Sequence, residues 1–155
     1  MRDQYRNSPA AGFSLVEMLM VVGMIGLLSL FAFPKVMRVF DQSQVRGARL
    51  AVLNKFNSAR IQARQSSRTA FLIRSGPLLW IERMPRVTTL SGSTRDTVGG
   101  FLHLREAYKV TADGTLDTVR IDPRGLTQGG SWRLKLSRGV ASDSLIISGF
   151  GTVTR

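Results

Sequence analysis

The apolar residues of this chain follow three successive patterns, and the first is a long unbroken run. Residues 13–33 are apolar apart from Ser14, Glu17 and Ser29. This run is about 21 residues long, and a helix needs roughly 20 to cross the hydrocarbon core of a bilayer. It therefore predicts a membrane-spanning helix. Pro34 predicts a kink after it, because proline has no N–H to donate and its ring clashes with the preceding turn.

The second pattern is that of an amphipathic helix over residues 35–68. Apolar residues recur at helical spacing and fall within one arc of roughly 80° when each residue advances by about 100°. They are Val45, Ala48, Val52, Phe56, Ala59 and Ala63. We expect this apolar stripe to pack on a sheet, with its alanines allowing a close approach. Together with the spanning segment, the helix would be about 50 residues long, or about 75–80 Å.

The third pattern, over residues 69–155, consists of short apolar or alternating runs separated by Gly, Pro, Ser and Asp, which is typical of strands and turns. Strands are expected at 69–74, 78–83, 100–105, 107–111, 116–121, 131–136 and 144–148, with a last short one at 151–154. Turns are expected at Ser75-Gly76-Pro77, Asp113-Gly114, Pro123-Arg124-Gly125 and Gly129-Gly130, and a flexible loop at 91–99. Trp80 and Trp132 are expected in the core rather than as stacking platforms. A long helix followed by strands predicts an α+β fold in which the helix lies across antiparallel sheets or a β-sandwich.

A short polar segment, residues 1–12, precedes the apolar run, and the polarity changes abruptly between Gly12 and Phe13. No small-residue secretory cleavage site follows the run, since Phe33, Pro34 and Lys35 come next. The stretch Gly12-Phe13-Ser14-Leu15-Val16-Glu17, followed by an apolar segment and Pro34, resembles the prepilin signal of type IV pilins and type II secretion pseudopilins. A plain signal anchor with a chance glutamate is the alternative.

The resemblance implies a precursor that is processed and then assembled. A prepilin peptidase would cut after Gly12, and Phe13 would become the methylated N-terminal residue. A glycine suits such a cut, because it lets a peptidase approach the scissile bond closely. Residues 13–34 would then serve first as membrane anchor and later as filament core. The implied partners are the peptidase, other pilin or pseudopilin subunits, an inner-membrane assembly platform and the lipid bilayer.

Glu17 does not fit a plain anchor. An ionised carboxylate costs about 2.5–3.5 kcal/mol at the bilayer centre and less near the interface. The ammonium that a cut would create on Phe13, in the same chain or in a neighbour, supplies a partner for this charge. Glu17 is therefore expected to act in assembly.

The orientation of the span is open to two interpretations. The resemblance implies a single-pass inner-membrane protein with its C-terminal domain in the periplasm, assembled into a periplasmic or extracellular filament. The distribution of basic residues points the other way. Two arginines precede the span and four basic residues follow it between positions 35 and 49, and positive charge normally stays in the cytoplasm.

The chain is strongly basic, with a formal net charge of +12, and 18 of its 22 basic residues are arginine. Such a surface favours nucleic acid, lipid headgroups or an acidic protein face, whereas the plainer interpretation is solubility with complementarity to acidic sister subunits. Several arginines form a basic stripe beside the apolar one. This stripe is compatible with a solvated face, with docking on subunits or headgroups, or with phosphate binding. The candidate anion- or DNA-binding residues are Arg46, Arg49, Arg60, Arg64, Arg68 and Arg155.

The second half of the chain is similar, more loosely, to the GspH/FimT branch of the same family. The similar features are the Ile121-Asp122-Pro123-Arg124-Gly125 segment and a last strand that ends in Ser148-Gly149 before a short basic tail. The branch implies a β-sandwich and a minor pseudopilin or minor pilin, in some members with DNA binding for uptake. Those members have a Gly-Arg-x-Arg tail, whereas residues 149–155 contain one arginine here. Type II secretion and type IV pili both remain open.

Enzymatic chemistry is expected to be absent, and the chain is expected to be a substrate of the peptidase and N-methyltransferase. The chain has no cysteine and one histidine, His103, in an alternating run typical of a strand. The absence of cysteine excludes thiol catalysis, and one histidine with scattered aspartates gives no ground for a Ser-His-Asp arrangement. Asp113, Asp117 and Asp122 cluster around a turn without the EF-hand spacing. Calcium stays open there, but no metal or cofactor is expected.

Overall fold

The computed structural model describes residues 12–85 and 95–154 of the chain. In these residues helix α1 spans Leu15–Ser66 and a short helix α2 spans Leu104–Tyr108. The strands are β1 Ala70–Ser75, β2 Leu78–Arg83, β3 Asp96–His103, β4 Thr111–Gly114, β5 Thr118–Ile121, β6 Thr127–Gln128, β7 Trp132–Arg138, β8 Ala141–Ile147 and β9 Val153–Thr154. The chain divides into two compact units, Met1–Met37 and Arg38–Arg155.

The described part of the first unit contains the apolar start of α1. Its large apolar side chains from Phe13 to Phe33 are all exposed, and an 18-residue window of α1 has a mean hydropathy of 2.3. The predicted helix over 13–33 is therefore confirmed as one that is long and apolar enough to cross a membrane. The helix assignment continues through Pro34, and a kink at this residue stays a prediction.

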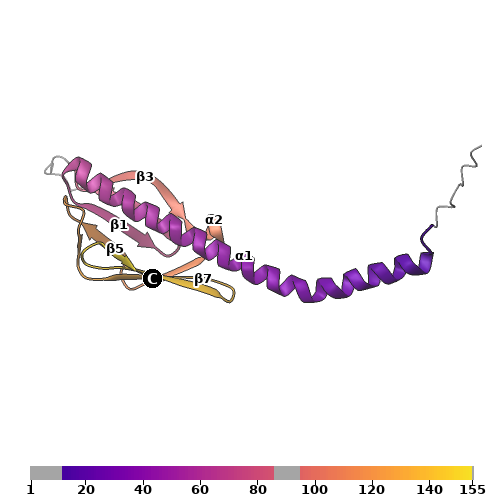
Figure 1. The fold of residues 1–155 in the computed structure, drawn as a ribbon. Coiled ribbons are helices and arrows are strands. Elements are labelled where there is room, and N and C mark those ends of the chain that lie inside the picture. Colours follow the sequence, from indigo (N-terminus) through magenta and orange to yellow (C-terminus); the bar gives the residue numbers. More distant parts are fainter. Residues whose placement is uncertain (1–11, 86–94, 155) are drawn as a thin grey trace, which may run out of the picture. The chain divides into compact units, whose positions relative to one another are not determined.

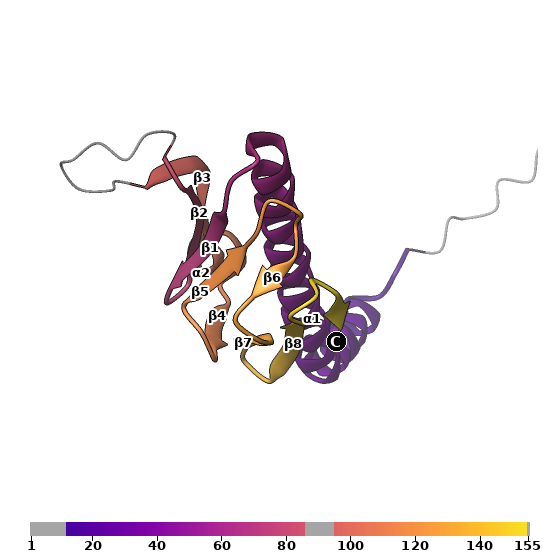
Figure 2. The same ribbon diagram turned by 90° about the vertical axis from the view of Figure 1, so that its left-hand side faces the viewer.

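In the second unit, the second half of α1 lies across antiparallel strands (Figures 1 and 2). The strands form two sheets, of order β3-β2-β1-β5-β6 and β4-β7-β8-β9. One hydrophobic core joins the helix to both sheets. The predicted α+β fold, with a long helix packed on antiparallel sheets, is confirmed.

The buried face of α1 is the predicted apolar stripe. Its members are each no more than 2% exposed: Val45, Ala48, Val52, Phe56, Ala59 and Ala63. Three of the six are alanines, whose short side chains let the helix backbone approach the sheets closely. Phe56 and Trp132 are among the largest fully buried side chains, so the core contains one large aromatic ring from the helix and one from β7.

Phe56→Ala is expected to lower the free energy of unfolding of the second unit by about 3–5 kcal/mol, because it leaves a cavity in the core. Urea unfolding of the detergent-solubilised chain, followed by tryptophan fluorescence, measures this loss. Ile61→Ala, on the exposed face of the same helix, is the control and should change stability by no more than about 0.5 kcal/mol. A reduction below about 1 kcal/mol for Phe56→Ala would contradict the packing described here.

The strand predicted at 107–111 is wrong, because residues 104–108 form α2. Leu104 is fully buried and anchors this turn of helix. Lys109 ends it with a φ of 55°, and its N–H donates to the Arg105 carbonyl (3.1 Å). Arg, Glu and Ala in this segment favour helix, a signal that the alternation of the preceding residues concealed.

Strand β3 begins inside the predicted loop 91–99, of which residues 91–94 lie outside the described part of the chain. The strand pairs with β2 in a register that shifts between Leu79 and Ile81. Gly99 has a φ of 73° at this irregularity, as is typical of a β-bulge. The Lys55 ammonium donates a hydrogen bond to the Gly100 carbonyl, and burial lowers the pKa of Lys55 below its usual 10.5.

The predicted turns are confirmed except for one. Ser75 pairs with Leu78, so Gly76 and Pro77 alone connect β1 to β2, and a φ of 56° at Gly76 suits the first position of such a hairpin. The turn at 123–125 and the bend at 129–130 are also present. The turn predicted at Asp113-Gly114 is wrong, because both residues lie in β4 and the chain turns after them.

One of the two tryptophans lies where it was predicted. Trp132 is buried in the core, and its Nε1–H donates to the Leu116 carbonyl (2.8 Å). Trp80 is half-buried, and its predicted core position is wrong. Leu79 and Ile81 of β2 point into the core, so Trp80 between them points to the opposite face of the sheet.

Candidate functional site

The first candidate site is the start of α1. Gly12 and Phe13 are exposed, and the helix begins two residues later at Leu15. The bond between Gly12 and Phe13 therefore lies before the helical hydrogen-bond ladder, between two exposed residues.

Ser14 caps this helix. Its Oγ accepts a hydrogen bond from the Glu17 N–H (3.3 Å). The Ser-x-x-Glu spacing is that of a capping box, and a carboxylate in the first turn also suits the positive end of the helix dipole. The sequence interpretation missed this second role of Glu17, although the spacing was the signal for it.

The apolar surface that follows has no cover from within the described part of the chain. Its large side chains are exposed along the whole segment, and a Cβ placed on Gly23 or Gly26 would meet no atom within 4 Å. A contiguous apolar surface of this extent is not expected to face water in a soluble monomer. Lipid or the apolar side chains of other helices would suit such a surface as neighbours.

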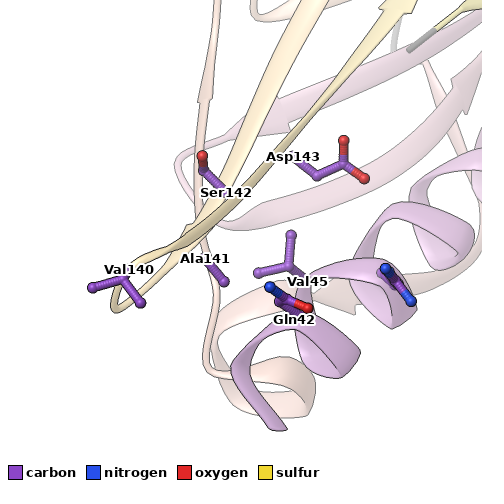
Figure 3. A pocket seen from close by; sticks show the side chains of 7 residues that line it. Gln42, Val45, Val140, Ala141, Ser142 and Asp143 are labelled. Atoms are coloured by element: carbon purple, nitrogen blue, oxygen red, sulfur yellow. The ribbon is translucent and has the colours of Figure 1, made fainter. Parts of the chain in front are cut away.

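The second candidate site is the basic stripe of α1, and the structure divides it into parts with different contacts. Arg49 forms an ion pair with Asp143 of β8 (Nη1–Oδ2, 3.5 Å). Figure 3 shows Asp143 pointing from β8 toward the helix, beside a hollow of about 250 Å³ that Gln42 and Arg46 also line. Arg49 thus helps to hold α1 against β8, whereas Arg46 is exposed.

Arg60 and Arg64 lie against the turn that follows β5. The Arg60 Nε–H donates to the Gly125 carbonyl (3.0 Å), and the Arg64 Nε–H donates to the Arg124 carbonyl (3.0 Å). Gly125 has a φ of 83°, and a Cβ at this position would lie 2.5 Å from Arg64 Nε. The backbone conformation therefore favours glycine here, and a larger residue would also displace the Arg64 side chain.

The turn itself is held by Asp122. Its Oδ1 accepts hydrogen bonds from the N–H groups of Arg124 (2.9 Å) and Leu126 (2.8 Å). Within residues 12–85 and 95–154, none of Arg60, Arg64 and Arg124 forms an ion pair with a carboxylate. We call these three residues the arginine cluster. Arg124 was not among the predicted residues, because only the fold brings it beside the helix.

The other predicted basic residues do not join the arginine cluster in the structure. Arg68 lines a separate hollow with Arg83 and Asp96. Arg155 lies outside the described residues.

The histidine and the remaining aspartates that were considered for catalysis or calcium binding lie in ion pairs or on strands. His103 lies 3.7 Å from Glu106 (Nδ1–Oε2), and Asp117 pairs with Arg74 (2.5 Å). Asp113 lies on β4 opposite Lys135 of β7. In the described residues, no group of three or more His, Asp or Glu side chains is placed to hold a metal ion. Asp113, Asp117 and Asp122 do not form such a group, and calcium binding at these aspartates stays an open question.

The crystal structure of the type IV minor pilin FimU from Pseudomonas aeruginosa strain PAO1 resembles this structure. The TM-score is 0.55 at 13% sequence identity, over 72% of this chain and 87% of that chain. The fold is the type IV pilin fold. A second crystal form of FimU gives a TM-score of 0.49 at 15% identity, over 73% of this chain and 90% of that one. No family model matches the chain, and no curated protein matches its sequence.

Proposed function

We propose that this protein is a minor pilin or pseudopilin, a structural subunit of a type IV pilus or a type II secretion pseudopilus. One observation carries the proposal: an exposed apolar helix start, with an accessible Gly12–Phe13 bond before it, belongs to the same helix that packs on a domain of the type IV pilin fold. The proposal includes the expectation that the chain is not an enzyme but a substrate of the prepilin peptidase and N-methyltransferase.

The proposed sequence of events is the one that the resemblance of residues 12–17 to a prepilin signal implies. A prepilin peptidase cuts after Gly12, and Phe13 is methylated. The apolar segment then exchanges lipid neighbours for the equivalent segments of other subunits. Glu17 pairs with the ammonium of Phe13 in a neighbour, because a carboxylate that enters an apolar filament core without a partner costs several kcal/mol.

This proposal places the protein in the inner membrane, with the second unit in the periplasm and an assembly platform as a further partner. The count of basic residues around the span predicts the opposite orientation. In this proposal the prepilin signal, rather than that count, determines the orientation. Membership of the GspH/FimT branch is part of the proposal and is supported by the Ile121–Gly125 segment, which forms the turn beneath α1.

Fractionation of cells that express the full chain tests the proposal. The protein is expected in the sheared or purified filament fraction, together with subunits that share an apolar N-terminal helix. A protein found only in the membrane under conditions in which filaments form would contradict a role as a filament subunit.

A second candidate function is binding of a polyanion such as DNA, and the arginine cluster favours it. Arg60 and Arg64 use their Nε atoms to contact main-chain carbonyls. Their guanidinium groups are thereby held against the turn that contains Arg124, and in the described residues none of the three arginines forms an ion pair. Guanidinium groups arranged in this way suit bidentate contacts with phosphate oxygens. Such contacts hold a nucleic-acid backbone without reading its sequence.

The double substitution Arg60→Gln/Arg64→Gln is expected to weaken binding of a DNA duplex. The slope of log K against log salt should fall by about 0.9 for each phosphate that the variant no longer neutralises. Fluorescence anisotropy with the detergent-solubilised chain over a salt series measures both quantities. The charge-matched control is Arg133→Gln/Lys135→Gln. Both residues lie on β7, on the outer face of the sheet β4-β7-β8-β9. Equal weakening in the two double variants would show that net charge alone attracts DNA, and absence of binding at physiological salt would exclude this function.

A further inference from the structure

The sheet β3-β2-β1-β5-β6 has an unusual outer face, on the side away from α1. Leu72, Leu79 and Ile81 point into the core, so the residues that alternate with them point outward. On that outer side Trp80 lies opposite Ile73, and the ring of Phe101 lies 6.0 Å from the ring of Trp80. Phe101, Trp80 and Ile73 thus form one continuous line across β3, β2 and β1, which we call the outer apolar row.

A charged row runs beside it. Phe71 lies opposite Glu82 on one side and opposite Arg120 on the other. Phe71 is only 6% exposed although it lies outside the connected core cluster, and the Arg95 guanidinium lies over its ring at 4.2 Å. The outer apolar row is therefore bordered by an aromatic ring under an arginine and by two further charged side chains.

Of the two charged side chains in this border, Glu82 has polar partners and Arg120 has no ion pair in the described residues. Glu82 accepts a hydrogen bond from Trp80 Nε1–H (2.9 Å) and lies 3.6 Å from Arg95 Nη1. Arg120 is exposed, and in the part of the chain that the structure describes it forms no ion pair. Among the described residues, Arg120 thus provides one positive charge beside the outer apolar row that has no ion-pair partner.

This composition is not that of a solvated sheet face. When one face of an antiparallel sheet packs on a core, the other is normally polar. Here the outward positions at the centre of β1, β2 and β3 carry two aromatic rings and an isoleucine, and Phe101 is 56% exposed. Trp, Phe and Arg are the residues enriched at the centres of protein interfaces.

We propose that the outer apolar row is a docking surface for a neighbouring subunit of the filament. That subunit presents an apolar side chain to Phe101 and Trp80, and a carboxylate to Arg120. The inference rests on the proposed function and adds to it a second contact, one that does not involve the N-terminal helix. Nucleic acid fits this surface less well, because Glu82 places a negative charge in it and the two rings are tilted by 55° rather than stacked in parallel.

Site-specific photo-crosslinking in cells that assemble filaments tests this surface with the full chain. Thr118 lies opposite Ile73, at the end of the outer apolar row, and is replaced by p-benzoylphenylalanine. Ser142, on the outer face of the other sheet, takes the same replacement as control. Irradiation is expected to link position 118, but not position 142, to a co-assembled subunit that mass spectrometry identifies by its own apolar N-terminal helix.

The dependence of this adduct on the neighbouring side chains distinguishes docking from mere proximity. Phe101→Ser and Arg120→Glu should each lower the adduct yield about tenfold, as expected for removal of an interface anchor. Lys135→Glu should leave the yield unchanged. Both Phe101 and Arg120 are exposed, so neither change should alter thermal unfolding of the chain, and this is measured in parallel.

Three results would overturn the inference. The first is a chain that enters the filament fraction but gives no subunit adduct at position 118. The second is an adduct that persists in both variants, and the third is an adduct that nuclease removes, which would assign the surface to nucleic acid. A chain that never enters the filament fraction would instead defeat the proposed function, and the docking surface with it.

Discussion

Glu17→Gln is expected to leave processing intact and to lower incorporation into filaments at least about tenfold, because an uncompensated charge in an apolar core costs several kcal/mol. In this variant the ammonium of Phe13 is the charge that enters the filament core without a partner, because the substituted glutamine carries no negative charge. The measurement is a quantitative comparison of the filament fraction with total mature protein.

Two further variants separate this charge from the capping role of Glu17. Ser14→Ala removes the oxygen that accepts the Glu17 N–H and keeps the carboxylate, so it should cost only about 0.5–2 kcal/mol of helix stability. Glu17→Ala removes both the charge and the capping-box side chain. If pairing with Phe13 dominates, the Gln and Ala variants assemble equally poorly and Ser14→Ala assembles nearly normally. Normal assembly of Glu17→Gln together with failure of Glu17→Ala would assign Glu17 to helix capping instead.

Gly12→Val is expected to abolish cutting and to leave the whole chain in the membrane as a precursor. A β-branched side chain beside the scissile bond prevents the close approach that glycine permits. Immunoblots should show a species larger by residues 1–12 and no signal in the filament fraction.

Gly23→Val is the matched control for this change. Gly23 lies within the apolar segment, and a Cβ there would meet no atom within 4 Å, so this variant should be cut at the normal rate. If Gly12→Val were processed like the control, the cut would not lie after Gly12.

Local sequence patterns predicted the features that depend on periodicity. The six buried residues of α1 recur at helical spacing, and this spacing alone identified the face that packs on the sheets. The strands around Leu72, Val119 and Leu134 were predicted for the same reason, since alternation records which side chains face a core. The pilin fold followed from the order of these elements together with the Gly12–Glu17 motif.

Features that depend on contacts between distant segments could not be predicted in this way. The ends of β3 are set by pairing with β2 and by the bulge at Gly99, which no local pattern records. The outward position of Trp80 was missed because a tryptophan in an apolar run gives no sign of which sheet face is covered. Likewise, the basic stripe gave no sign that Arg49, Arg60 and Arg64 contact β8 and the turn after β5.

The decisive measurement is the mass, with N-terminal peptide mapping, of the natural mature protein taken from the membrane and filament fractions. We predict a mature chain that begins at Phe13 and carries one added methyl group there. A mature chain that still begins at Met1, or one trimmed beyond Pro34, would contradict it.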